Sequence, residues 1–262
     1  MAAMTEATER SRPAQRQAEI VEHVMQHGSV SANELAELFH VSLMTIHRDL
    51  DELERQGVVR KFRGGVSAQP SSVFESNVSF RLRTAKAEKV AMAQRARELI
   101  EPGMAIMLDD STTTLEVARL LEDAAPLTVM TNFLETIKLL STMRGIRLLA
   151  LGGEYYPTHD SFLGVPCIDA IEALRVDLLF ASTSAVSGSY AYHQEQEIVL
   201  VKRAMIRAAQ RSVLMVDHTK LGRASLHRLA PLSDIDLVLT DKQAPPEALL
   251  EMRESGVKYE VV

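Results

Sequence analysis

The sequence predicts an α/β protein of two units: a small N-terminal module of three helices and a β-hairpin, then a larger unit with a mostly parallel sheet. Two observations predict this division. Apolar residues recur with helical spacing up to about residue 56, whereas short apolar runs alternate with helical patterns from residue 80 onward. A serine-rich stretch without periodicity, residues 67–79, separates the two patterns and is expected to be a linker. We therefore expect the units at residues 14–66 and 80–262.

Composition places the chain among ordinary folded proteins. With 46% apolar and 24% charged residues, its 262 residues can build two cores. The chain has no run of about 18 apolar residues, and its first residues lack the apolar stretch of a secretion signal, so we expect no membrane partner and a cytoplasmic location. The lone cysteine, Cys167, excludes an internal disulfide and a thiolate zinc cage. The net charge of −6 argues against indiscriminate coating of nucleic acid but permits a local basic surface.

Two helices are expected before residue 42. Apolar residues fall on one side of residues 14–26, which predicts the first helix. Ser31 and Glu34 have the spacing of a capping box, so a second helix is expected to begin after Ser31. That helix is expected to bury Leu35 and Leu38.

The third helix is expected to begin after Ser42 and to reach Gln56. Within it Ile46, Leu50 and Leu53 form one apolar stripe at helical spacing. The pattern then becomes extended over residues 58–63 and ends in two glycines, Gly64 and Gly65. We interpret residues 58–65 as a two-stranded wing with a basic edge.

Two short helices joined by a tight turn and followed by a basic hairpin are typical of a winged helix-turn-helix, whose second helix enters the major groove of DNA. An outward-facing Arg48 can bind guanine in a bidentate manner, and the N–H groups near Ser42 can meet a phosphate. The candidate DNA-binding residues are Ser31, Ser42, Met44, Thr45, His47, Arg48, Arg60, Lys61 and Arg63. The alternative, a three-helix subdomain for protein contacts, is disfavoured by the combination of caps, tight turn and basic wing.

Residues 16–66 resemble the signature of DeoR-type transcriptional regulators. The matching residues are Arg16, Ile20, Glu34-Leu35-Ala36, Phe39, Val41-Ser42, Thr45-Ile46, Arg48-Asp49-Leu50, Leu53-Glu54, Gly57, Arg60 and Gly64-Gly65. The resemblance implies binding to double-stranded operator DNA. His47 stands where the family usually has Arg, and Arg63 stands where the family often has His. Because one winged module buries too little surface for operator affinity, we expect a homo-oligomer, a dimer or a tetramer, on paired half-sites.

The second unit is expected to be Rossmann-like. Its candidate strands are residues 104–109, 127–131, 147–151, 176–182, 212–217, 236–240 and 257–262. Its candidate helices are residues 84–100, 113–121, 133–141, 196–210 and 246–254. Most of the strands read as continuous apolar runs, as strands covered on both faces do. Ligands of such sheets bind beyond the carboxyl ends of the strands.

Polar residues gather where the predicted strands end. Residues 109–114 end a strand and open a helix, and hydroxyls and N–H groups at a helix start suit a phosphate while a carboxylate suits sugar hydroxyls. Glycines after a strand let the backbone approach a ligand, and lysines supply positive charge. The candidate effector-binding residues are Asp109, Asp110, Ser111, Thr112, Thr113, Thr114, Asn132, Gly152, Gly153, Lys202 and Lys220. The alternatives are a capped helix start for the threonines and solvated surface for the lysines.

The second unit also resembles the DeoR effector domain, which is related in fold to sugar-phosphate isomerases such as ribose-phosphate isomerase. The matching motifs are Lys89, Leu108-Asp109, Thr112-Thr113-Thr114, Thr131-Asn132, Gly152-Gly153-Glu154, Phe162, Gly164, Val201-Lys202-Arg203-Ala204-Met205, Asp217, Lys220 and Gly222. The resemblance implies a small phosphorylated sugar as the effector. Ser111 and Ala185 stand where the family favours Gly, and residues 182–197 are atypical.

We expect a transcriptional repressor of a carbohydrate-metabolism operon, relieved by a phosphorylated sugar or polyol, with no catalytic residues, metal or cofactor. One alternative is a sugar-phosphate isomerase carrying a DNA-binding segment, with Asp109 or Asp110 as the base; the other is a pure interaction module. Four polar pairs are expected to be inert: His23 with His27, His159 with Asp160, His193 with Glu195, and Asp217 with His218.

Overall fold

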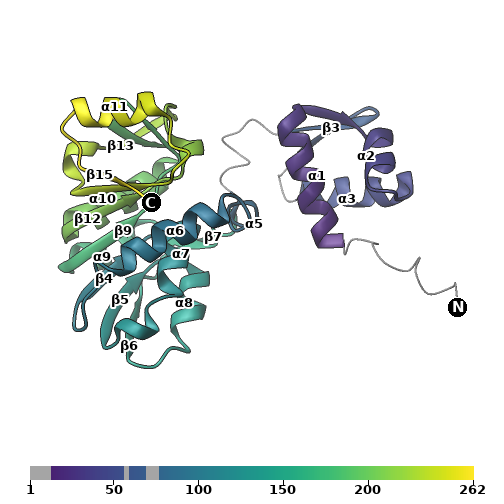
Figure 1. Cartoon of the computed structure of the whole chain (residues 1–262). Coiled ribbons are helices and arrows are strands. Elements are labelled where there is room, and N and C mark those ends of the chain that lie inside the picture. The colour runs from purple at the N-terminus through teal and green to yellow at the C-terminus, as the bar shows by residue number, and fades with distance from the viewer. Residues whose placement is uncertain (1–12, 56–58, 69–76) are drawn as a thin grey trace, which may run out of the picture. The chain divides into compact units, whose positions relative to one another are not determined.

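The computed structural model describes residues 13–55, 59–68 and 77–262, and its contacts divide the chain into residues 1–81 and 82–262 (Figure 1). The first unit contains, in order, α1 (Pro13–His27), β1 (Ser29–Ser31), α2 (Ala32–Leu38), α3 (Leu43–Arg55), β2 (Val59–Phe62) and β3 (Gly65–Ala68). The three strands form an antiparallel sheet in the order β1-β3-β2. The three helices and the hairpin that the sequence predicts for the N-terminal module are therefore present.

The core of the first unit confirms the predicted stripe of the third helix. Ile46, Leu50 and Leu53 are buried against α1 and the sheet. Leu35 of α2 is buried as predicted, but the prediction for Leu38 is wrong, because its side chain is 48% exposed. The sequence pattern also missed β1, which is too short to show an alternation of apolar and polar residues.

The predicted linker is shorter in the structure than in the sequence pattern. Strand β3 continues to Ala68, and α5 (Val78–Arg81) begins before the predicted linker ends. Residues 69–76, the middle of that stretch, lie outside the described residues, as do Gln56 and Val58. Val66 of β3 is buried in the core, but one apolar residue in so short a strand gives no recognisable period in the sequence.

The second unit is built on a seven-stranded parallel sheet of order β15-β14-β12-β9-β4-β5-β6 (Figure 1). Its strands are β4 (Ala105–Leu108), β5 (Leu127–Thr131), β6 (Ile146–Ala150), β9 (Val176–Ala181), β12 (Ala209–Met215), β14 (Leu237–Thr240) and β15 (Tyr259–Val261). All seven predicted strands form, and all neighbours run parallel. Their side chains alternate between two cores, one on each face of the sheet.

Six helices flank this sheet: α6 (Lys86–Arg97), α7 (Thr112–Ala118), α8 (Leu134–Leu140), α9 (Val165–Glu172), α10 (Gln196–Ala208) and α11 (Pro246–Glu254). Buried residues of α6, α7 and α8 join one core, and those of α9, α10 and α11 join the other. The sequence pattern missed α9, where glycine and proline stand at the start and obscure the helical period. No helix within the described ranges is long and apolar enough to cross a membrane.

Short strands that the sequence pattern missed lie between the main elements. A hairpin of β7 (Glu154–Tyr156) and β8 (Ser161–Leu163) follows β6. A small antiparallel sheet combines β10 (Ala185–Ser187), β11 (Tyr190–His193) and β13 (His227–Pro231). These strands follow the carboxyl ends of the main sheet, and they carry side chains to the edge where ligands of parallel sheets bind.

Candidate DNA-binding surface and effector site

Hydroxyl caps position the two helices of the helix-turn-helix. The Ser31 hydroxyl accepts a hydrogen bond from the backbone N–H of Glu34 (3.1 Å). The Ser42 hydroxyl accepts one from the N–H of Thr45 (3.2 Å) and is hydrogen-bonded to the Thr45 hydroxyl (2.9 Å). The predicted caps are thus confirmed, and each cap fixes the start of its helix.

The outward face of α3 carries the candidate base-reading side chains. Met44 is 67% exposed, His47 and Arg48 are exposed, and Thr45 is half-buried on the flank. Acidic residues occupy the second half of α3, at Asp51 and beyond. The part of the helix suited to DNA is therefore its first two turns.

A buried ion pair that the sequence pattern missed ties α3 to α1. Arg16 Nε lies 2.6 Å from Asp49 Oδ2, and Gln17 Nε2 donates to Asp49 Oδ1 (3.0 Å). Asp49 lies next to Leu50 and faces inward with the apolar stripe. A carboxylate on the apolar face of α3, with Arg16 in the first helix, is the signal in the sequence for this pair.

The wing is fastened to α3 by one of its candidate DNA contacts. The Lys61 ammonium forms an ion pair with Asp51, and the Lys61 N–H donates to Glu54 Oε1 (2.9 Å). Arg60 and Arg63 are exposed. Gly65 is required here, because a Cβ would meet Val30 O at 2.5 Å and the Phe62 ring at 2.8 Å. Lys61 is therefore tied to α3, whereas the two arginines of the wing are exposed.

This arrangement predicts different effects for two neighbouring cations. Arg60→Ala is expected to reduce the slope of log affinity against log salt by about 0.9, the value of one lost phosphate contact. Lys61→Ala is expected to change that slope less, because the ammonium it removes is already paired with Asp51. Gel-shift titrations over a range of salt concentrations measure both. Equal slope changes in the two variants would contradict this assignment.

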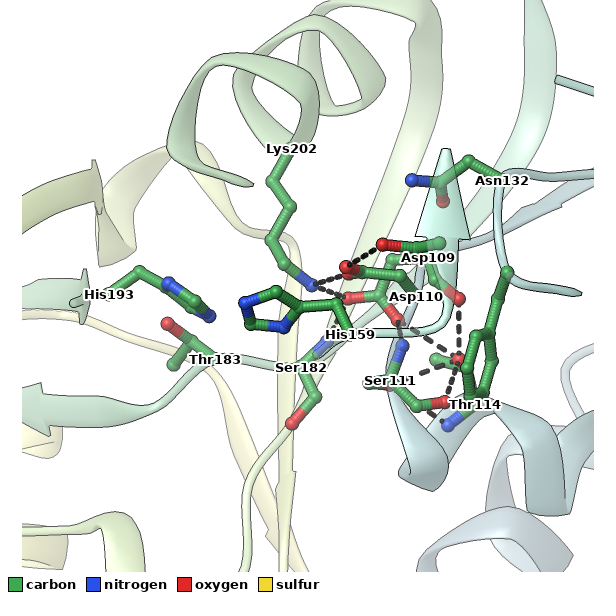
Figure 2. Close-up of polar contacts among 12 residues, drawn as sticks. Asp109, Asp110, Ser111, Thr114, Asn132, His159, Ser182, Thr183, His193 and Lys202 are labelled. Carbon is green, nitrogen blue, oxygen red and sulfur yellow. Dashed lines mark hydrogen bonds and ion pairs between the residues drawn. The ribbon is translucent and has the colours of Figure 1, made fainter. Parts of the chain in front are cut away.

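In the second unit, Asp109 lies at the centre of a polar network beyond the end of β4 (Figure 2). Its Oδ1 accepts hydrogen bonds from the N–H of Ser111 (3.0 Å) and the hydroxyl of Thr114 (2.9 Å). Its Oδ2 accepts one from the N–H of Ser182 (2.7 Å) and contacts the Lys202 ammonium. These four donors use the acceptor sites of the carboxylate, so Asp109 holds three elements together.

Lys202 extends from α10 into this network and is 3% exposed. Its ammonium lies between Asp109 and Asp110, with Asp110 Oδ1 2.9 Å away (Figure 2). Burial alone would lower the pKa of Lys202, but the two carboxylates raise it above its ordinary value. The other oxygen of Asp110 accepts a hydrogen bond from the Ser161 hydroxyl (3.2 Å). Lys202 is therefore charged and buried.

A second group of charged side chains surrounds Asp217, which follows β12. In this group positive charges outnumber negative ones, whereas around Lys202 the negative charges outnumber the positive one. Lys220 Nζ lies 3.3 Å from Asp217 Oδ2 and 3.4 Å from the Ser182 hydroxyl. Lys89, on α6, donates to the Thr112 hydroxyl (3.0 Å). Burial raises the pKa of Asp217, but the charge of Lys220, the hydrogen bond from the Thr219 hydroxyl and the charge of Lys89 together more than offset this and bring the pKa to about 2. Two ammonium groups thus accompany one carboxylate.

Some of the remaining candidate effector residues lie at the carboxyl edge of the sheet, and others make contacts that support the fold. Ser111 caps α7 by accepting from the N–H of Thr114 (3.1 Å), and Thr113 is buried with them. The Asn132 amide donates to Phe162 O (2.9 Å), and its buried Oδ1 has no hydrogen-bond partner among the described residues. Gly152 is exposed. Gly153, at φ +152°, approaches protein backbone, because a Cβ there would meet Leu163 O at 2.2 Å.

His159 and Asp160 do not pair with each other, and the Glu195 carboxylate contacts His159 rather than His193. His159 Nε2 lies 2.8 Å from Glu195 Oε2, while Asp160 accepts a hydrogen bond from the Tyr155 hydroxyl. His193 Nδ1 accepts from the backbone N–H of Glu195 (3.2 Å). Figure 2 shows His159 and His193 beside the Lys202 group. The sequence pattern missed this cluster because the residues that it joins lie far apart in the chain.

The other singled-out residues carry no evident chemistry. His218 Nδ1 lies 3.0 Å from Asp241 Oδ1 rather than against Asp217. Among the residues that the structure describes, no cluster of three His, Cys, Asp or Glu side chains is arranged to hold a metal. Burial raises the pKa of the Cys167 thiol to about 12, so it remains protonated in the core.

Comparison with known proteins decides the family. A model described as the DeoR C terminal sensor domain matches residues 84–242, and one described as a DeoR-like helix-turn-helix domain matches residues 16–72. The chain belongs to the DeoR family. This DeoR-family chain is therefore a DNA-binding transcriptional regulator, and its two units are the two parts of that architecture.

Named relatives align with this DeoR-family chain over most of their length. The glycerol-3-phosphate regulon repressor of Escherichia coli (strain K12) is 31% identical over 252 residues, which cover 94% of this chain and 98% of the relative. The HTH-type transcriptional repressor GlcR of Bacillus subtilis (strain 168) is 31% identical over 233 residues, which cover 89% and 90%. A ribose 5-phosphate isomerase A from Methanocaldococcus jannaschii matches 52% of this chain and 55% of its own, with a TM-score of 0.39 and 17% identity. That likeness is too remote to bear on ligand or activity.

Proposed function

We propose that the chain represses a carbohydrate-metabolism operon and leaves its operator when a phosphorylated sugar or polyol binds the second unit. The relatives named as repressors support the direction of regulation. The observation that carries the ligand class is the pair of charge groups at one sheet edge: Lys89 and Lys220 around Asp217, and Asp109 and Asp110 around Lys202. An ester phosphate fits the first group and hydroxyls fit the second.

The network itself assigns different tasks to its members. Asp109 uses its acceptor sites on the protein, so its task is to hold α7, α10 and the end of β9 in place. Recognition of hydroxyls then falls on Asp110 and on the unpartnered Oδ1 of Asn132. Because a saturated carboxylate is a poor base, Asp109 is also unsuited to isomerisation. We therefore favour a sensor over an enzyme.

On the DNA side, the first two turns of α3 read bases, and the exposed arginines of the wing contact phosphates. Two or more copies on paired half-sites supply operator affinity that one winged module lacks. Binding of ligand to the second unit must lower the affinity of the assembled protein for DNA, since a ligand shifts an equilibrium only through a difference in affinity between two states.

Replacing Lys220 with methionine tests the phosphate group. The variant is expected to lose most of the melting-temperature increase that a phosphorylated sugar causes, because the phosphate loses an ammonium partner, while the affinity of the free protein for operator DNA stays unchanged. Lys242→Met, which removes an exposed lysine, is the matched control. Equal ligand-induced increases in wild type and Lys220→Met would contradict the assignment.

A further inference from the structure

The side chains of His159, His193 and Glu195 lie together beside Lys202 and its two carboxylate partners. The proposed function gives these three side chains no part in ligand binding. His159 contacts the Glu195 carboxylate at 2.8 Å, Glu195 donates its backbone N–H to His193, and the two imidazole rings lie 6.2 Å apart. His159 and His193 are buried, and Glu195 is half-buried. We call His159, His193 and Glu195 the histidine wall.

The histidine wall lies at the same carboxyl edge of the sheet as Lys202. His159 precedes by two residues Ser161, whose hydroxyl donates to Asp110. Glu195 is the N-cap of α10, two turns before Lys202, and residues at that spacing share a helix face. Figure 2 shows the His159 ring between His193 and the Asp109–Lys202 pair.

The charges of this edge are unevenly distributed. On the side of the histidine wall, the carboxylates of Asp109, Asp110 and Glu195 accompany the single ammonium of Lys202. On the other side, Lys89 and Lys220 accompany Asp217. A ligand carboxylate placed at the histidine wall would be repelled by the excess negative charge, whereas uncharged hydroxyls can both donate to carboxylates and exchange hydrogen bonds with imidazoles.

We propose that the histidine wall selects effectors whose end opposite the phosphate is an uncharged polyhydroxyl chain, and that it rejects phosphorylated sugar acids. The inference rests on the proposed function, which places the phosphate at Lys89 and Lys220. Glu195 has two tasks. Its charge repels a ligand carboxylate, and its N–H holds the Nδ1 of His193 as an acceptor, so that the neutral ring carries its proton on Nε2 and donates from that atom.

Matched pairs of phosphates test the inference with the full-length protein. In each pair a terminal CH2OH group is replaced by a carboxylate: glycerol 3-phosphate against 3-phosphoglycerate, erythritol 4-phosphate against 4-phosphoerythronate, and glucitol 6-phosphate against 6-phosphogluconate. Titration calorimetry is expected to show that, in the pair of the best-fitting length, the neutral member binds at least about tenfold more tightly. A sugar acid that binds as tightly as its neutral partner, or more tightly, overturns the inference and leaves the proposed function standing. If all six compounds fail to bind, the proposed function fails and the inference fails with it.

The variant Glu195→Gln identifies the source of the discrimination. Glutamine keeps a polar side chain of similar shape beside His159 and the backbone N–H for His193 but removes the charge, so the preference for the neutral member is expected to fall to within about threefold. Glu247→Gln, an exposed carboxylate in the first turn of α11, is the matched control and is expected to keep the full preference. If Glu195→Gln lowers the melting temperature of the free protein, His193→Asn, which is expected to weaken the neutral member selectively, replaces it. An unchanged preference in the folded variant contradicts the role of the histidine wall.

Discussion

Replacing Asp49 with alanine is expected to lower the stability of the first unit by about 3–5 kcal/mol and to abolish operator binding. The Arg16 and Asp49 side chains are only 7% and 5% exposed, and their atoms approach to 2.6 Å. Arginine cannot lose its proton in a protein, so the variant would leave a buried guanidinium between α1 and α3 without the Asp49 carboxylate that neutralises it. Helix α3 would then lose the contact that sets its position, although its outward face is unaltered.

The two units can be followed separately in one urea titration. All five tyrosines lie in the second unit, so tyrosine fluorescence reports that unit, whereas circular dichroism reports both. In Asp49→Ala the early part of the circular dichroism transition is expected to move to lower urea while the fluorescence transition stays in place. Arg48→Ala is the control: its side chain is exposed, so it is expected to lose operator binding at unchanged stability.

The double variant Arg16→Met/Asp49→Leu is expected to recover stability, because it removes both charges. Less than about 1 kcal/mol of loss in Asp49→Ala would contradict a structural role for the pair.

Replacing Lys202 with methionine is expected to destabilise the second unit by about 3–5 kcal/mol at neutral pH and to remove its response to ligand. The substitution would leave the buried carboxylates of Asp109 and Asp110 side by side without their shared cation. Two adjacent carboxylates repel one another strongly when both are buried. The tyrosine fluorescence transition in urea measures the loss.

Two further measurements sharpen this prediction. Adding Asp110→Asn to Lys202→Met is expected to restore part of the stability, because it removes one of the two like charges, whereas Lys242→Met alone is expected to have no effect.

In the wild type the pKa of Lys202 is raised above its ordinary 10.5. Its contribution is therefore fully present below pH 10.5 and is lost only as the pH rises through the higher value of the folded protein. Wild-type stability that declined between pH 7 and 9 through this residue would be inconsistent with the buried ion pair.

The sequence predicts most of the scaffold because its elements have strong local patterns. Most of the seven parallel strands contain continuous apolar runs, and α3 carries a clear apolar stripe, so these elements could be identified without their neighbours. The hairpin β7–β8 and the sheet of β10, β11 and β13 could not, because their strands of three to five residues contain too few positions for a period. Leu38 shows the opposite failure: it has the right spacing for burial, but α2 is so short that it ends there in solvent.

The sequence predicts which residues gather at the candidate site but not what each of them contacts there. Residues 109–114 and Lys202 do gather at the carboxyl edge of the sheet, as strand ends in a parallel sheet must. Two of the donors that bind the Asp109 carboxylate are the N–H of Ser182 and the ammonium of Lys202. They lie 73 and 93 residues away in the chain. Likewise the pairing of His159 with Glu195 arises only when β8 and the start of α10 are brought together. Such long-range partners leave no local signal in the sequence.

The central position of Asp109 also sets an order of events during protein synthesis. Its partners span residues 111–202, so the sensing edge cannot be completed until α10 has left the ribosome. The described strands and helices of the DNA-binding module are all present once Ala68 has emerged, and domains generally fold as units from the N-terminus during translation. A nascent or prematurely terminated chain therefore possesses the operator-reading module before it possesses the means to be switched off.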